Sequence, residues 1–190
     1  DHMPPDVQRG LPPHLIGMEA CGTAHHWARE LTSLGHTVKL LPPRDVKGYL
    51  RRGKTDAADA EAICEAVTRA RHKGVPIKSV EQQCALIPHK LRESLLSQRT
   101  ETTNRLRSHL AELGLIAEIG ARGVEKLVTL VWDESEKALP PQARLALQSL
   151  ARLLAGIDAE ITALDAQIRV AHKACPTSRR LEAIPSVGLI

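Results

Sequence analysis

Aromatic residues are nearly missing from this chain of 190 residues, which has two tryptophans, one tyrosine and no phenylalanine. Stacking of nucleobases on aromatic rings is therefore a minor contribution to any nucleic-acid binding. Apolar runs that approach the roughly 18 residues needed to span a bilayer are also missing, as is a secretory signal. These absences predict a soluble, cytoplasmic protein with no membrane segment.

Cysteine is scarce and carries no metal-binding spacing. The four cysteines show neither CxxC nor zinc-ribbon patterns, which predicts reduced thiols. Cys21 precedes the pair His25-His26, but no fourth zinc ligand is evident, and histidines on a helix beside a sheet are more often packing or surface residues.

The N-terminal half predicts a β-α-β unit. Residues 1–14 are proline-rich without apolar periodicity, and we expect a disordered leader there. Residues 15–18 predict a buried strand ending at Glu19, and residues 24–34 a helix stopped by Gly35. Residues 37–41 predict a second strand, closed by Pro42-Pro43. Such units have parallel strands, and functional groups gather at the carboxyl ends of those strands.

Two aspartates follow this unit at helical spacing. At about 100° per residue, Asp56 and Asp59 fall on the same stripe as Ile63 and Val67, so we expect them to face inward. Carboxylates turned inward need a compensating cation or hydrogen-bond network, and a divalent metal is the simplest compensator. Glu19 at its strand end supplies a third carboxylate. Three oxygen ligands suit Mg²⁺ or Mn²⁺, which are common in phosphodiester chemistry. The alternative is that Asp56 caps the helix and Asp59 occupies its first turn.

Positive charge is clustered near these acids. The formal net charge is +4 with a pI near 9.0, a modest excess that favours polyanions where it is concentrated. Basic residues cluster before the acid pair and recur along a later helix, where a solvated helical face is an equally good explanation. The predicted nucleic-acid-binding residues are Arg44, Lys47, Arg51, Arg52 and Lys54 in the first group, with Arg99, Arg105 and Arg107 in the second.

The second half predicts long helices. After a linker at residues 74–80, one helix is expected to run to about Leu113, with Pro88 kinking it or delaying its start. A shorter helix covers 124–132, and a last one runs from about 141 to 173. Apolar residues in the last helix recur at alternating steps of four and three, which is typical of a coiled coil. Its partner is either the earlier helix or another subunit, so we expect a helical region over 81–177 that supports a homo-oligomer.

The fold class predicted from these patterns is α/β plus α. Residues 178–190 contain an Ile-Pro-x-Val-Gly segment, similar to the hairpin of a helix-hairpin-helix module, that ends before a second helix.

Several motifs together resemble one family, the DEDD-type transposases of bacterial insertion sequences, or bridge-RNA-guided recombinases. The motifs that carry the resemblance are Met18-Glu19-Ala20-Cys21-Gly22, His25-His26-Trp27-Ala28-Arg29, Leu41-Pro42-Pro43, the run from Lys54 to Ile63, and Ile184-Pro185. The resemblance implies a partial RuvC-like (ribonuclease H-like) domain over 15–73, a coiled-coil connection, and the start of a C-terminal transposase domain over 178–190.

The resemblance also implies a site and partners. Glu19, Asp56 and Asp59 match the second, third and fourth of the four family acids that bind divalent metal, here Mg²⁺ or Mn²⁺. The implied partners are DNA and a structured guide RNA. The first aspartate has no counterpart, and the nucleophilic serine would lie in the C-terminal domain. We therefore expect a copy truncated at both ends and inactive alone. A non-catalytic nucleic-acid-binding or dimerisation module and a small Mg-dependent nuclease are the alternatives.

Overall fold

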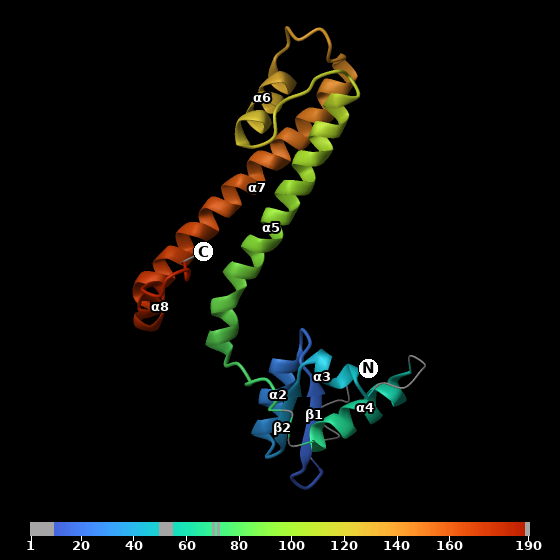
Figure 1. Ribbon diagram of the computed structural model, residues 1–190, viewed down its shortest axis with the longest axis vertical. Helices are drawn as coiled ribbons and strands as arrows, with labels where there is room; N and C mark the ends of the chain where they lie inside the picture. Colours follow the sequence, from blue (N-terminus) through green and yellow to red (C-terminus); the bar gives the residue numbers. More distant parts are fainter. Residues whose placement is uncertain (1–9, 50–54, 70, 72, 189–190) are drawn as a thin grey trace. The chain divides into compact units, whose positions relative to one another are not determined.

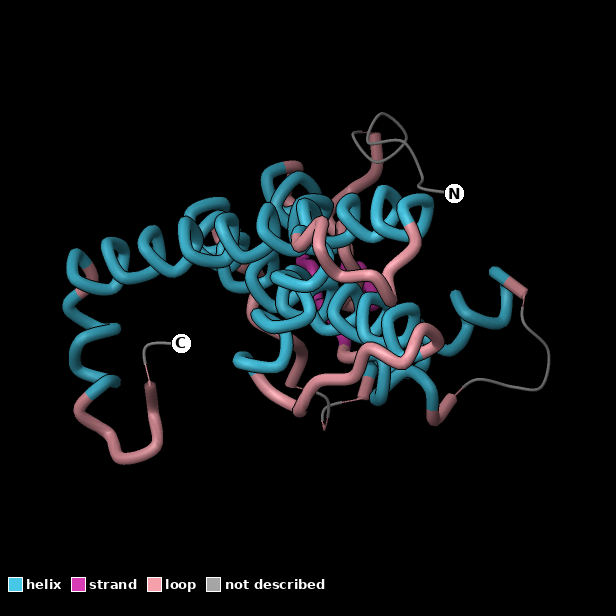
Figure 2. Tube along the Cα trace, turned by 90° about the horizontal axis from the view of Figure 1, so that it is seen from above, coloured by secondary structure: helices cyan, strands magenta, loops and turns pink. Residues whose placement is uncertain are grey.

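We describe the structure from a computed structural model, which defines residues 10–49, 55–69, 71 and 73–188. The chain divides into two compact units, residues 1–83 and residues 84–190. Within the described residues, helix predominates and the only strands are β1 and β2 (Figures 1 and 2). The two units are described separately. The predicted leader lies mostly outside the described residues.

The first unit contains the predicted β-α-β arrangement. Strands β1 (Leu15–Glu19) and β2 (Thr37–Leu41) are parallel, and helix α2 (Ala24–Ser33) connects them. Gly35 follows α2 with φ of +92°, a conformation that glycine adopts without steric cost. The strand and helix bounds therefore confirm the predicted β-α-β unit, whereas a complete RuvC-like sheet is not among the described elements.

Helices cover both faces of this small sheet. Leu40 packs with Ala24 and Ala28 of α2, whereas the next residue, Leu41, packs with Ala62 and Val67 of helix α4 (Asp56–Thr68). Successive side chains of a strand point to opposite faces, so α2 and α4 lie on opposite sides of the sheet.

The contact between β1 and α4 is very close. A Cβ placed on Gly17 would lie 2.9 Å from the Cβ of Val67 and 3.0 Å from Cγ2 of Ile63. Glycine lets the helix approach the strand backbone directly, and the alanines of α4 serve the same purpose. The C-terminal half of α4 is thereby fixed against the strand that ends at Glu19.

Two features at the end of β2 were not predicted. The Pro42-Pro43 pair does not simply close the strand, because Pro43 begins a one-turn helix, α3 (Pro43–Lys47). Further along the chain, Val75 forms an antiparallel bridge with Leu40, and its N–H donates to the Leu40 carbonyl at 2.7 Å. Gly74, with φ of +72°, makes the turn that brings the chain back to this strand.

The second unit is built on two long helices, α5 (Val80–Ala111) and α7 (Pro141–Ala174). Helix α5 begins in the last residues of the first unit, and helix α6 (Ala121–Trp132) lies between the long helices in sequence. Arg92 pairs with Asp165 and Arg99 pairs with Asp158, so α5 and α7 run antiparallel within one chain. Helix α8 (Pro176–Glu182) follows α7.

An aliphatic core joins these helices. Leu106 and Leu110 of α5, Leu127 and Val131 of α6, and Leu147 of α7 form one buried cluster. Farther along α7, steps of three, seven and four residues separate the buried side chains Leu154, Ile157, Leu164 and Ile168. The heptad pattern therefore faces inward, and the helical partner inside the chain is α5. A supercoiled coiled coil and its use between subunits remain predictions.

We predicted that Pro88 would either kink this helix or delay its start, and the structure shows no delayed start. The helix begins at Val80 and contains Pro88 in its interior. Proline cannot donate the hydrogen bond that the carbonyl of Cys84 would otherwise accept, but Cys84 is exposed and its carbonyl is within reach of water.

Candidate functional site

Glu19 lies where the sequence placed it, at the carboxyl end of β1. It pairs in register with Leu41, the last residue of β2, and is half-buried. The N–H of Ala20 donates to the carbonyl of Leu41 at 2.8 Å, which fixes the backbone just beyond the carboxylate. Glu19 is therefore held at the sheet edge where functional groups of parallel sheets gather.

Asp56 and Asp59 do not face inward, which corrects the helical-stripe prediction. Both are exposed and lie in the first turn of α4. The stripe is partly buried at Ile63 and buried at Val67, because the helix meets the sheet with its C-terminal half. Figure 1 shows the N-terminal end of α4 projecting away from the strands. Angular position on a helix thus predicted the face correctly but not how much of that face is covered.

The capping alternative is correct for Asp59, which lies in the first turn of α4, and wrong for Asp56, which is not the cap. Thr55 is the N-cap, with its Oγ1 accepting a hydrogen bond from the N–H of Ala58 at 3.2 Å. Asp56 and Asp59 contribute negative charge to the positive end of the helix dipole. Because Thr55 performs the capping, neither aspartate is needed for it.

The three carboxylates fit a divalent cation by donor type but are not gathered around one point. Within the ranges that the structure describes, no three His, Cys, Asp or Glu side chains are arranged to hold a metal ion. Carboxylate oxygens remain the ligands that Mg²⁺ and Mn²⁺ prefer. The alternative zinc site also lacks a ligand group, and His25 instead accepts a hydrogen bond from the N–H of Lys78 at 3.2 Å.

The basic cluster before the acids is only partly described. Arg44 and Lys47 are exposed on α3, and Arg44 Nε lies 3.6 Å from the carboxylate of Asp45. Arg51, Arg52 and Lys54 lie outside the described residues.

The arginines predicted to bind nucleic acid from the later helix have partners within the protein. Arg99 pairs with Asp158, and Arg105 pairs with Glu101 one turn earlier. Arg107 donates to the carbonyls of Ala117 and Glu118, at 3.1 and 2.8 Å, and holds the loop before α6. These contacts explain the three side chains structurally, and their binding of nucleic acid remains a prediction.

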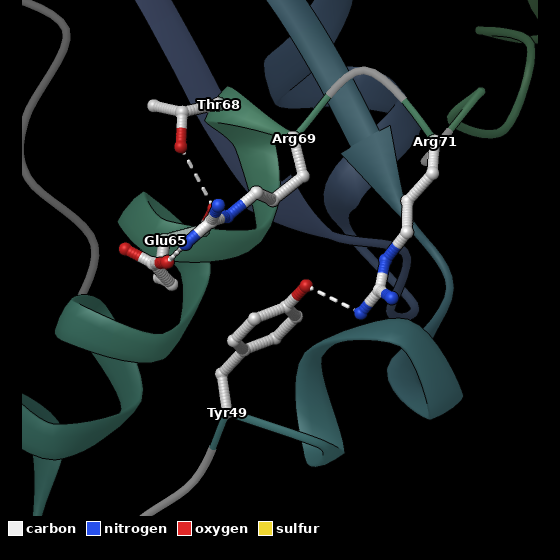
Figure 3. A network of polar contacts seen from close by, with 5 residues as sticks. All are labelled: Tyr49, Glu65, Thr68, Arg69 and Arg71. Atoms are coloured by element: carbon white, nitrogen blue, oxygen red, sulfur yellow. Dashed lines mark hydrogen bonds and ion pairs between the residues drawn. The ribbon is translucent and has the colours of Figure 1, made fainter.

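Sequence reasoning missed a polar cluster near the end of α4, drawn in Figure 3. Arg71 donates to the hydroxyl of Tyr49 at 2.8 Å, and its Cζ lies 5.9 Å from the centre of the tyrosine ring. Arg69 pairs with Glu65, and the hydrogen bond that it donates to this carboxylate is the main reason that the pKa of Arg69 is raised. The Glu65-Arg69 spacing of four residues was visible in the sequence, whereas the Tyr49-Arg71 contact was not.

A hollow of about 390 Å³ lies beside this cluster, at the carboxyl end of β2. Its lining residues come from the start of α3 and from the segment after α4. They are Pro42, Arg44, Asp45, Arg71, Lys73 and Gly74.

The segment predicted to start a C-terminal domain forms a helix and a turn. His172 Nδ1 is 2.8 Å from the Ser178 hydroxyl, and its Nε2 is 3.0 Å from the carboxylate of Glu182. These contacts hold α8 against the end of α7. None of the helices described here is both long and apolar enough to cross a membrane.

Comparison with known proteins identifies the family. A family model for DEDD transposases of the IS110 type matches residues 6–114, which include β1, α4 and all three candidate acids. The chain therefore belongs to the IS110-type DEDD transposase family.

Curated relatives agree with this assignment. The chain is 42% identical over 186 residues to a protein of Pseudomonas aeruginosa named probable family 20 transposase, covering 97% of this chain and 55% of that protein. It is 34% identical over 175 residues to the transposase for insertion sequence element IS1111A of Coxiella burnetii, covering 92% and 48%. It is also 32% identical over 179 residues to the transposase for IS1328 of Yersinia enterocolitica, covering 94% and 53%. The chain spans about half the length of these relatives.

Proposed function

We propose that this chain is part of a DNA transposase that moves an insertion sequence, and that Glu19, Asp56 and Asp59 form its divalent-metal site. One observation carries the proposal, the family match over residues 6–114, which spans all three acids. The placement of Glu19 at the carboxyl end of β1 supports it, because this is the edge at which α/β folds place their chemistry.

Each acid has a defined task in this proposal. Glu19 is the fixed ligand, since β1 is held by both β2 and α4. Asp56 and Asp59 are ligands on the first turn of α4, where Thr55 maintains the helix end without them. A bound Mg²⁺ or Mn²⁺ supplies Lewis-acid stabilisation of the oxygens that attack and leave in phosphodiester exchange.

Metal binding tests the site directly. Mn²⁺ binding is measured by the loss of the electron paramagnetic resonance signal of the free ion. We expect the affinity to fall at least about tenfold in the Glu19→Gln variant and in the double variant Asp56→Asn, Asp59→Asn. Glu30→Gln is the matched control, because Glu30 is an exposed acid on α2. Equal Mn²⁺ affinity in the control and in the site variants would show that these three acids do not form a metal site.

A second candidate function is a nucleic-acid-binding or dimerisation module without chemistry. The exposure of Asp56 and Asp59, and the lack of a gathered metal group among the described residues, favour it. Unchanged oligonucleotide binding in the aspartate variants, with no cleavage by the unmutated chain in Mg²⁺, supports this second function. Cleavage in Mg²⁺ that disappears in the same variants supports a small metal-dependent nuclease.

The partners of the transposase are also proposed to include a structured guide RNA and a second copy of the chain. Apolar side chains of α5 that the antiparallel pairing leaves exposed, among them Ile87 and Leu91, support self-association. Light scattering during size-exclusion chromatography measures it, with the double change Ile87→Gln and Leu91→Gln expected to shift a dimer toward monomer. A monomeric unmutated chain contradicts this part.

A further inference from the structure

The hollow at the carboxyl end of β2 has an unusual balance of charge. Among the residues that the structure describes, Arg44, Arg71 and Lys73 line it together with one carboxylate, Asp45. The cations come from two segments that are far apart in sequence, so their convergence results from the fold. This differs from a solvated helical face, where basic residues are spread along one helix.

Structural contacts hold these residues in place. Lys73 precedes Gly74, which has a left-handed conformation. The next residue, Val75, forms a bridge with Leu40 and so ties the segment to β2. A side chain on Gly74 would meet the Leu40 carbonyl at 3.0 Å, so the segment follows the strand closely. The position of Lys73 is therefore set by the sheet.

Tyr49 orients the guanidinium of Arg71. Its hydroxyl accepts a hydrogen bond from Arg71 at 2.8 Å, and its ring lies under the guanidinium, with 5.9 Å from Cζ to the ring centre (Figure 3). Arg44 contributes a highly exposed side chain, 87% accessible, whose Nε lies 3.6 Å from the Asp45 carboxylate.

The hollow is also close to Glu19, one of the three candidate acids. Pro42 lines it and directly follows Leu41, the register partner of Glu19. A group held in the hollow is thus near the strand end that carries a proposed metal ligand. Three cations facing one carboxylate, in a concave site beside a phosphodiester-processing edge, suit an anion with several acceptor oxygens.

We propose that this hollow binds a backbone phosphate of nucleic acid, with Arg44, Arg71 and Lys73 as the contacting cations and Tyr49 as a positioning residue. This inference rests on the proposed function, and it assigns the phosphate contact to residues that no motif of the sequence indicated together. DNA and RNA share this phosphodiester chemistry, and the test separates them.

Binding is measured by fluorescence anisotropy with the full chain, a fluorescein-labelled DNA duplex and a labelled RNA hairpin, both in EDTA over a range of salt. Arg44→Gln and Lys73→Gln are each expected to weaken binding about five- to tenfold and to reduce the slope of log affinity against log salt by about one. Tyr49→Phe keeps the ring but removes the hydroxyl, and a loss of about threefold is expected while the salt slope stays unchanged.

Arg69→Gln is the matched control, since Arg69 is a neighbouring exposed arginine that pairs with Glu65 and does not line the hollow. It removes the same charge and is expected to change affinity less than twofold. The hollow is not a phosphate site if Arg69→Gln weakens binding as much as the hollow variants do, or if the hollow variants bind normally. The proposal also fails if the unmutated chain binds neither probe. Preference for one probe identifies the source of the phosphate.

The experiment is independent of the metal site. EDTA removes divalent cations, so a failed acid site leaves these affinities unchanged. Conversely, if Mn²⁺ binds normally and the hollow variants bind the oligonucleotides as well as the unmutated chain does, only this inference is overturned. Circular dichroism of each variant confirms that the helices are retained.

Discussion

The two units use their cations in different ways. In residues 84–190, Arg92 and Arg99 join α5 to α7, Arg107 holds a loop, and Arg144 is buried among carbonyl groups. In the first unit, Arg44 and Lys73 instead line an open hollow beside the sheet. The number of basic residues therefore does not locate a nucleic-acid surface, because long helices use guanidinium groups as internal connectors.

The two cores also differ. Small residues, among them Gly17 and Ala66, let backbones approach closely in the first unit, whereas leucines fill the cluster of the second. Overpacking is therefore the main hazard in the first unit, and loss of a connector is the main hazard in the second. The following changes test both sides of this comparison.

Replacing Arg144 with Met has the largest expected effect. Its guanidinium donates to the carbonyls of Leu130 and Leu139 at 3.2 Å and of Glu136 at 2.7 Å, and also to that of Asp133. Removing it leaves several carbonyl groups without a donor, and we expect a loss of about 3 kcal/mol in the free energy of unfolding.

Urea unfolding, followed by the fluorescence of Trp132 near these carbonyls, measures this loss. Arg169→Met on the exposed side of α7 is the control, with a change expected within about 0.5 kcal/mol. Equal losses in the two variants would mean that Arg144 is not a connector.

Gly17→Ala tests the close packing of the first unit. The new methyl group would meet Val67 at 2.9 Å, so α4 must move away from β1, and we expect a cost of about 1–3 kcal/mol. Fluorescence of Trp27, in a Trp132→Phe background, reports unfolding of this unit. The same change at Gly48, where nothing lies within 4 Å, is expected to be near neutral.

A double-mutant cycle on Arg92 and Asp165 measures a connector at the helix pair. Both side chains are partly exposed, at 24% and 22%, so the coupling between Arg92→Gln and Asp165→Asn is expected to be about 0.5 kcal/mol. Raising the salt concentration should reduce it. Zero coupling at low salt would show that the pair does not help to join the helices.

The smallest effect concerns Asp133, which follows α6. Hydrogen bonds from the Ser135 hydroxyl at 2.6 Å and from the Ser135 N–H at 2.9 Å lower the pKa of this carboxyl below 3.8. A lowered pKa in the folded state means that the stabilisation is present above about pH 4 and is lost as the pH falls through the lowered value. The difference in Tm between the unmutated chain and Asp133→Asn should therefore be constant near neutrality and disappear in acid. A constant difference down to pH 2 contradicts this assignment.

Much of the fold was predictable because local signals agreed. Gly35 and the apolar runs on either side of it determine the β-α-β unit, and Gly114 with Pro140 delimits the helices of the second half. Helix α3 was missed because Pro43 was interpreted as the end of a strand, although proline equally suits the first turn of a helix.

The candidate site was less predictable. The identity of the acids followed from motifs, but the exposure of Asp56 depends on how far α4 extends beyond the sheet, which no periodicity encodes. Likewise, Arg99 finds its partner 59 residues away, and Arg71 finds Tyr49 22 residues away. Contacts at such separations are products of the tertiary fold.

The two ion pairs between the long helices have a consequence for how the helical hairpin finds its alignment. Arg92 and Arg99 are one heptad apart, and so are their partners Asp158 and Asp165. If α7 slipped by one heptad, both native pairs would break, but Arg99 would meet Asp165 or Arg92 would meet Asp158, so the net loss would be one ion pair. Because such a pair contributes about 1 kcal/mol or less, charge alone discriminates weakly against misaligned hairpins. Arg144 binds carbonyl groups of α6 and of the loop before α7, so it fixes α6 on α7, and the alignment of α5 with α7 is left to their apolar packing.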